Sequence, residues 1–245
     1  MQRWRNSLTI GCALAAALSI HVLAEGVDVT AHVAFQNRAG ATAHKTAADR
    51  MTSPGEVVIW LTPLQPDRTP AAVGHAGSFR LVQKDKMFMP HLLVVPIGSS
   101  VEFPNQDPFF HNVFSLFNGK RFDLGLYESG TSRAVRFDRE GVSYIFCNIH
   151  PEMGAVVVAL STPYWSVSNT SGGITIHGVP AGSYRMHVWS EAARVASSAE
   201  TERIVQVGDA PVHLGEIILE GSTDPLTHHK NKFGEDYRAD RVPSY

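Results

Sequence analysis

Short apolar or alternating runs recur along this chain between turn residues, and this spacing most limits how the chain can fold. The runs are EVVIWL, SFRLVQ, HLLVVP, SVEFPN, HNVFSL, RAVRFD, VSYIFC and GAVVVAL. Runs that are rich in Val, Ile and Phe and bounded by Gly, Pro and Asn predict strands. No helical period is found among them, and the 14 prolines and 20 glycines also favour β structure. We therefore expect an all-β protein.

The spacing of the runs divides the chain into parts. They are closely set between residues 76 and 161, as in a β-sandwich or small barrel. From residue 162 a second texture begins, in which two alternating runs flank the turn GVPAG. We expect a β segment at 25–75, a domain at 76–161, a second small β-sandwich at 162–220 and a loosely ordered polar tail at 221–245.

The first 24 residues have the pattern of a secretory signal peptide. Two arginines precede an apolar core, and VLA stands directly before Glu25. We expect cleavage after Ala24 and a periplasmic or secreted protein. An uncleaved membrane anchor is the alternative, and the abrupt change to polar sequence argues against it. After cleavage no run is long and apolar enough to span a membrane.

Charge and cysteine content limit the classes of function that this chain can have. The chain has 21 Lys and Arg against 23 Asp and Glu, with no basic stripe, so we expect no nucleic-acid partner. Cys12 lies in the predicted signal peptide, which leaves Cys147 alone in the mature chain. A disulfide within the mature chain is then impossible. A lone thiol in an oxidising compartment is a liability unless it is buried or bound.

The residues around Cys147 suggest that its thiol binds a metal ion. The stretch YIFCNIHPEMG places Cys147, His150 and Met153 at three-residue steps. A thiolate, an imidazole and a thioether form a soft ligand set, which favours copper over magnesium, calcium or manganese. A blue-copper site needs a second histidine, and the candidate is His111 in FPNQDPFFHNVFSL. The alternative is that Cys147 and Met153 are ordinary core residues and His150 a surface residue.

These residues carry a resemblance to a known family. VPIGSSVEFPNQDPFFHNVFS, followed by REGVSYIFCNIHPEMGAVVV, resembles the plastocyanin/amicyanin branch of the cupredoxins, over roughly residues 76–161. The resemblance implies a Greek-key β-sandwich that holds one type 1 copper ion. It further implies equatorial ligands at His111, Cys147 and His150, a weak axial ligand at Met153, and a hydrogen-bonding role for Asn112 between the ligand loops.

The region after residue 162 resembles a second family. GGITIHGVPAGSYRMHV is similar to the carboxypeptidase regulatory-like (transthyretin-like) β-sandwich. The first strands of that family look like VDVTAHVAFQNRAGA and GEVVIWLTP, which here lie far upstream. Our hypothesis is one discontinuous sandwich, with residues 76–161 inserted as a separate domain. The alternative is that residues 25–62 extend the middle domain. The combination resembles methylamine utilisation-type periplasmic cupredoxin proteins.

The cupredoxin resemblance implies an electron carrier rather than an enzyme, serving a redox protein such as a dehydrogenase or cytochrome. The sequence has no His-x-His pair, which excludes the trinuclear cluster of a multicopper oxidase. Phe109, Phe110 and Pro151 are candidates for an apolar docking patch, with ordinary loop packing as the alternative. Copper storage or delivery through the same ligands remains open. So does a non-redox binding module, in which Trp165 and Trp189 mark a contact surface.

Four histidines need a further interpretation. We expect His150 to reach the surface and to be the point at which electrons leave. His91 is a rival nitrogen ligand, but it opens a predicted strand where the family has no ligand, so we expect it to be structural or to orient a ligand. The pair at 228–229 lies in the polar tail, where it would hold a metal ion only loosely.

Overall fold

The computed structural model describes residues 26–36, 56–65, 76–116, 119–193, 203–221 and 229–237. The predicted signal peptide lies outside these ranges. Within them every regular element is a strand, so the all-β prediction is confirmed. The described part of the chain contains no helix with the length and apolar character needed to cross a membrane.

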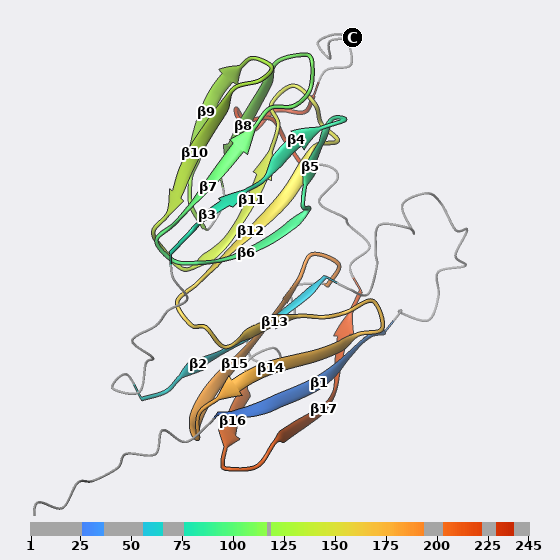
Figure 1. Cartoon of the computed structure of the whole chain (residues 1–245). Coiled ribbons are helices and arrows are strands. Elements are labelled where there is room, and N and C mark those ends of the chain that lie inside the picture. Colours follow the sequence, from blue (N-terminus) through green and yellow to red (C-terminus); the bar gives the residue numbers. More distant parts are fainter. Residues whose placement is uncertain are drawn as a thin grey trace, which may run out of the picture.

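The first sandwich is the upper half of the molecule in Figure 1. It comprises β3 (Ser78–Arg80), β4 (Val82–Lys84), β5 (Met87–Met89), β6 (Leu92–Pro96), β7 (Ser99–Pro104), β8 (His111–Ser115), β9 (Phe122–Tyr127), β10 (Ser132–Phe137), β11 (Gly141–Phe146) and β12 (Gly154–Leu160). A five-stranded sheet, β6-β12-β11-β8-β9, lies opposite a three-stranded sheet, β10-β7-β3, and β4 and β5 form a hairpin.

The second sandwich is the lower half in Figure 1. It comprises β1 (Val27–Gln36), β2 (Val57–Pro63), β13 (Trp165–Val167), β14 (Gly173–Val179), β15 (Gly182–Ser190), β16 (Arg203–Val207) and β17 (Val212–Glu220). Its sheets have the orders β13-β2-β15-β16 and β14-β1-β17. Each sheet thus joins strands from both sides of residues 76–161, which is the pairing that a discontinuous sandwich requires. The domain boundaries themselves stay a prediction.

Two strands explain how the halves are joined. Along β12, Ala155, Val157 and Ala159 belong to the core of the first sandwich, whereas Val156, Val158 and Leu160 face the second. Along β2, Val57, Ile59 and Leu61 face the core of the second sandwich, whereas Val58 faces the first. A strand covered on both faces reads as a continuous apolar run, which accounts for GAVVVAL and VVIWL.

We call the apolar layer between the halves the seam. Its buried residues are Val58, Val94, Val156, Val158 and Leu160. Trp165 and Trp189, which the sequence suggested as contact residues, pack against this layer and are partly buried. The surface that these two tryptophans contact is therefore the other half of the same chain.

Candidate metal centre

Strand pairing brings the predicted ligands to one edge of the first sandwich. β8 and β11 are antiparallel, with Phe114 opposite Phe146, so the start of β8 and the end of β11 lie at the same edge. His111 is the first residue of β8, and Cys147 directly follows β11. The loop after Cys147 turns back through two backbone hydrogen bonds, from Cys147 N to Met153 O (3.3 Å) and from Met153 N to His150 O (3.1 Å).

Three donor atoms meet at this edge. The Sγ of Cys147 lies 3.7 Å from Nδ1 of His111 and 3.6 Å from Nδ1 of His150, and the two Nδ1 atoms are 3.1 Å apart. All three residues are 0% exposed. A point equidistant from these atoms lies about 2 Å from each, which is the length of a transition-metal bond to nitrogen. Met153, also 0% exposed, belongs to the same core cluster as Cys147.

A buried carboxylate orients the first histidine. Nε2 of His111 donates to Oδ2 of Asp107 at 2.8 Å, so the lone pair of Nδ1 faces Cys147 and His150. Asp107 also accepts the backbone N–H groups of Asp85 (2.6 Å) and Lys86 (3.0 Å). Both of those residues have φ of 55°, so the carboxylate stabilises a hairpin turn in the left-handed region as well.

Sequence reasoning missed Asp107. Burial alone would raise its pKa, but hydrogen bonds from Lys86, His111 and Asp85 together hold the pKa below its ordinary value. The carboxylate therefore stays charged beside the imidazole. Its only signal in the sequence is its position four residues before His111, and that spacing has no fixed geometry in a turn.

Burial sets the protonation of the donors. It lowers the pKa of His111, and it lowers the pKa of His150 to about 4, helped by the neighbouring His111. Burial raises the pKa of the Cys147 thiol, against backbone hydrogen bonds from Asn112, Ile149 and His150. Two neutral imidazoles are ready to bind, and a metal ion would have to displace only the thiol proton. This donor set fits a soft transition metal such as copper.

Asn112 lies beside the centre, as expected, but its side chain has a different partner. Its Nδ2 donates to Oδ1 of Asp123 on β9 at 2.7 Å. Its backbone N–H is the group that contacts the Cys147 sulfur and opposes the rise in the thiol pKa. The contact between the segment holding His111 and the Cys147 loop thus runs through the backbone of Asn112.

The expectation that His150 reaches the surface is wrong, because its side chain is fully buried. The Phe109 ring lies 5.5 Å from the His150 ring and 5.2 Å from the His111 ring, between centroids. Phe110, the next residue, is 45% exposed, and Pro151 is partly buried. Phe109 therefore packs against both imidazoles, and the next residue in the chain offers exposed apolar surface.

The prediction of a loosely ordered tail is wrong for residues 229–237, which pack against the Cys147 loop. Tyr237 donates its hydroxyl to the Cys147 carbonyl at 2.7 Å, and the Lys232 backbone N–H donates to Asn148 Oδ1 at 2.9 Å. The His229 ring stacks on Phe146 with centroids 3.9 Å apart. Its neighbour in the HH pair lies outside the described residues. No local pattern could have found these contacts, which join positions some 90 residues apart.

Comparison with known proteins gives matches among solved structures only. No family model matches this sequence, and no curated protein matches it. A Cu-containing nitrite reductase from Thermus scotoductus SA-01 is 22% identical over 34% of this chain, with a TM-score of 0.33. A purple cupredoxin from Nitrosopumilus maritimus is 24% identical over 34% of this chain and 99% of its own, with a TM-score of 0.31.

Amicyanin is a further match. A mutant of amicyanin in its reduced form is 17% identical over 42% of this chain and 98% of its own, with a TM-score of 0.33. The present chain spans 22% of the nitrite reductase chain. Two of these three proteins are a copper protein and a cupredoxin by name, and each of the three matches less than half of this chain.

Proposed function

We propose that this chain is an exported one-electron carrier that binds a single type 1 copper ion in the first sandwich. The observation that supports this most is the buried triangle of Cys147 Sγ, His111 Nδ1 and His150 Nδ1. These atoms would be the equatorial ligands, and Met153 the weak axial one. Bound copper supplies a one-electron cycle between its Cu(II) and Cu(I) states.

The chain's own residues would keep that cycle free of large movements. The hydrogen bond to Asp107 fixes the His111 ring, and the backbone hydrogen bonds of Met153 fix the loop that carries His150. Because the donors are fully buried, bulk water is excluded from them. With four protein ligands no position is open for a substrate, so we propose a carrier and not an enzyme.

The partner would be a redox protein, a dehydrogenase or a cytochrome, in the periplasm or outside the cell. Phe110 offers exposed apolar surface, and Phe109 contacts the rings of both histidines. Together with Pro151 they form the docking patch of this proposal, with a short apolar path from the surface to the cluster. Apolar patches of this kind mark interaction sites on soluble proteins.

The test is the visible absorption spectrum of residues 25–245 loaded with Cu(II), recorded beside a Cys147→Ala variant. We expect an intense blue band that the variant lacks and that ascorbate bleaches reversibly. The unfolding midpoints of the copper-free proteins provide the control for folding. A colourless protein that binds Cu(I) and releases it readily would indicate storage or delivery instead. If the folded protein binds no copper, a non-redox binding module is the remaining hypothesis.

A further inference from the structure

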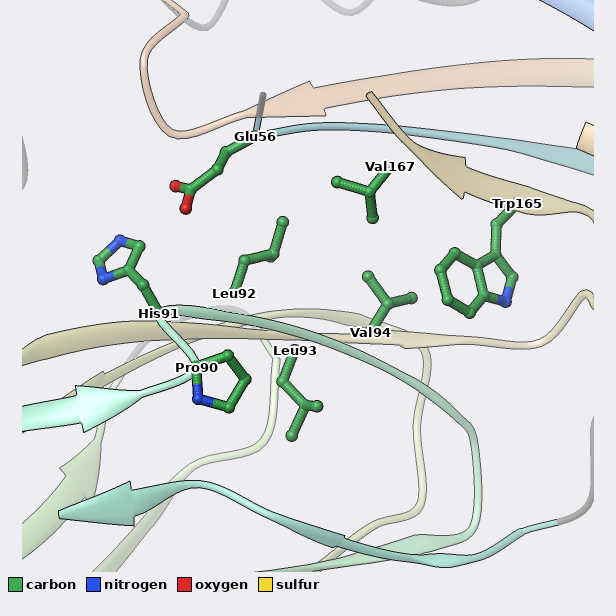
Figure 2. A pocket seen from close by; sticks show the side chains of 8 residues that line it. All are labelled: Glu56, Pro90, His91, Leu92, Leu93, Val94, Trp165 and Val167. Atoms are coloured by element: carbon green, nitrogen blue, oxygen red, sulfur yellow. The ribbon is translucent and has the colours of Figure 1, made fainter. Parts of the chain in front are cut away.

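A second cluster of potential metal ligands, one histidine and two glutamates, lies at the edge of the seam, away from the candidate copper centre. It consists of Glu56, directly before β2, His91, directly before β6, and Glu191, directly after β15. Their ligand atoms all lie within 4.8 Å of one another. Figure 2 shows the Glu56 carboxylate and the His91 ring turned toward the same gap, at one end of an apolar pocket. His91 comes from the first sandwich and both glutamates from the second.

Strand register forces the two carboxylates together. β2 and β15 are antiparallel, with Val57 opposite Ser190, so Glu56 and Glu191 are the next residues at the same strand ends. Like charges in opposite positions destabilise a strand pair. Water screens the repulsion between the two carboxylates only in part, because the Glu191 side chain is 22% exposed. Burial also raises the pKa of Glu56. A positive charge between the carboxylates would remove this repulsion.

His91 is oriented as a metal-binding histidine is. Its Nδ1 lies 3.1 Å from the carbonyl oxygen of Gly154, which can only accept, so Nδ1 carries a proton. Its Nε2 lies 2.5 Å from Oε2 of Glu191. A histidine that ligates a metal usually donates its other ring N–H to a carbonyl or carboxylate in this way. Without a metal, Nε2 donates a hydrogen bond to Glu191, and this contact raises the pKa of His91, so a metal ion would have to displace the Nε2 proton before that nitrogen could bind it.

We propose that Glu56, His91 and Glu191 bind a divalent transition-metal ion of the Zn²⁺ type, which links the two sandwiches. One imidazole nitrogen and two carboxylate oxygens are an established kind of ligand set for such ions, and two carboxylates balance the charge of a divalent cation. The adjoining pocket of about 410 Å³ leaves room for the waters that complete the coordination. The competing arrangement, a protonated His91 paired with Glu191, keeps one negative charge and binds no metal.

Calorimetric titration of the full mature chain with Zn²⁺ decides between these arrangements. The seam variant is Glu56→Gln with Glu191→Gln, which keeps the shape and removes both charges. The matched control is His32→Asn with Glu216→Gln, an exposed pair 3.9 Å apart on the second sandwich. We expect the seam variant to bind one Zn²⁺ fewer than the wild type, and the control to bind the same number. An equal number in all three proteins would overturn the proposal.

A second measurement observes the wild type directly and uses a substitution only to assign the signal. In the wild type labelled with ¹⁵N-histidine, Zn²⁺ should shift the Nε2 resonance of His91, assigned by its loss in His91→Asn. An unshifted resonance at saturating Zn²⁺ contradicts the proposal even where the seam variant does not fold. The same calorimetric titration of Cys147→Ala separates the two centres. The Zn²⁺ ion at the edge of the seam should still bind in this variant, whether or not Cys147 binds copper.

Discussion

His111 and His91 are held in the same manner and yet face different chemistry. Each fixes one ring nitrogen on an acceptor, which is Asp107 Oδ2 for His111 and the Gly154 carbonyl for His91. The other nitrogen of His111 faces a sulfur and a second imidazole in a fully buried site. The other nitrogen of His91 faces carboxylates in a half-buried cluster at the edge of the seam. The neighbours of each ring, and not the histidine itself, determine which metal fits.

The two clusters also differ in what they connect. The first cluster lies within one sandwich, between the start of β8 and the loop after β11. The second joins segments of both sandwiches. A buried site within one rigid unit suits a centre that must keep one geometry in two oxidation states. A half-buried site between two units suits an ion that holds them together.

The strongest test of this comparison is to make the same change at both histidines. We expect His111→Ala to abolish the intense blue band of the Cu(II)-loaded protein, because one equatorial donor is lost. We expect His91→Ala to leave the band in place, because His91 contacts neither the Cys147 sulfur nor the other imidazoles. Visible absorption with far-UV circular dichroism as the folding control gives the answer. A band lost in both variants would mean that the two clusters are not separate.

The seam itself predicts the next largest effect. Leu160 is 1% exposed and lies between the sandwiches, so Leu160→Ala should lower the free energy of unfolding by about 2–5 kcal/mol. Leu126→Ala is the control, since Leu126 is 54% exposed and should change stability by at most about 0.5 kcal/mol. Urea unfolding measures both. Equal, small losses would show that the sandwiches do not depend on each other.

The difference between the clusters also explains how much the sequence could predict. Cys147, His150 and Met153 fall within one turn, and only His111 had to be brought from elsewhere, so a local motif identified the first cluster. Nothing in the sequence relates Glu56 to Glu191. They meet because Val57 pairs with Ser190, and this register is a property of the folded sheet. His91 was accordingly expected to be structural or to orient a ligand.

The same reason separates the parts of the fold that were predicted from those that were not. Alternating and apolar runs predicted the strands, because the order of apolar and polar residues depends on whether one face of a strand is buried or both. The seam was not predicted, because an apolar run such as GAVVVAL does not tell which layer covers each face. The tail was misread because its composition is polar, whereas Tyr237 and Lys232 are held by hydrogen bonds to residues far away in the sequence.

Asp107 tests whether the carboxylate contact to His111 matters for metal binding. Oδ1 accepts from Asp85, and Oδ2 from Lys86 and His111, so the single oxygen of an asparagine cannot serve all three. Asp107→Asn should weaken Cu(I) binding by roughly 10–100-fold, as loss of a residue that orients a ligand typically does. Competition with a Cu(I) chelator measures this. Asp138→Asn, which removes an exposed partner of Lys120, should leave the affinity unchanged.

The smallest expected effect concerns residues 229–237, which pack against the loop of Cys147. Among the described residues, no such segment packs against the cluster at the seam. Tyr237→Phe removes the hydroxyl that donates to the Cys147 carbonyl at 2.7 Å, and this should lower the free energy of unfolding by about 0.5–1.5 kcal/mol. Phe233→Leu in the same segment is the control, because Phe233 is 72% exposed. Urea unfolding gives the stability, and the visible spectrum of the Cu(II) form should be unchanged in both variants. A shifted band in Tyr237→Phe alone would show that residues 229–237 shape the ligand loop and do more than cover it.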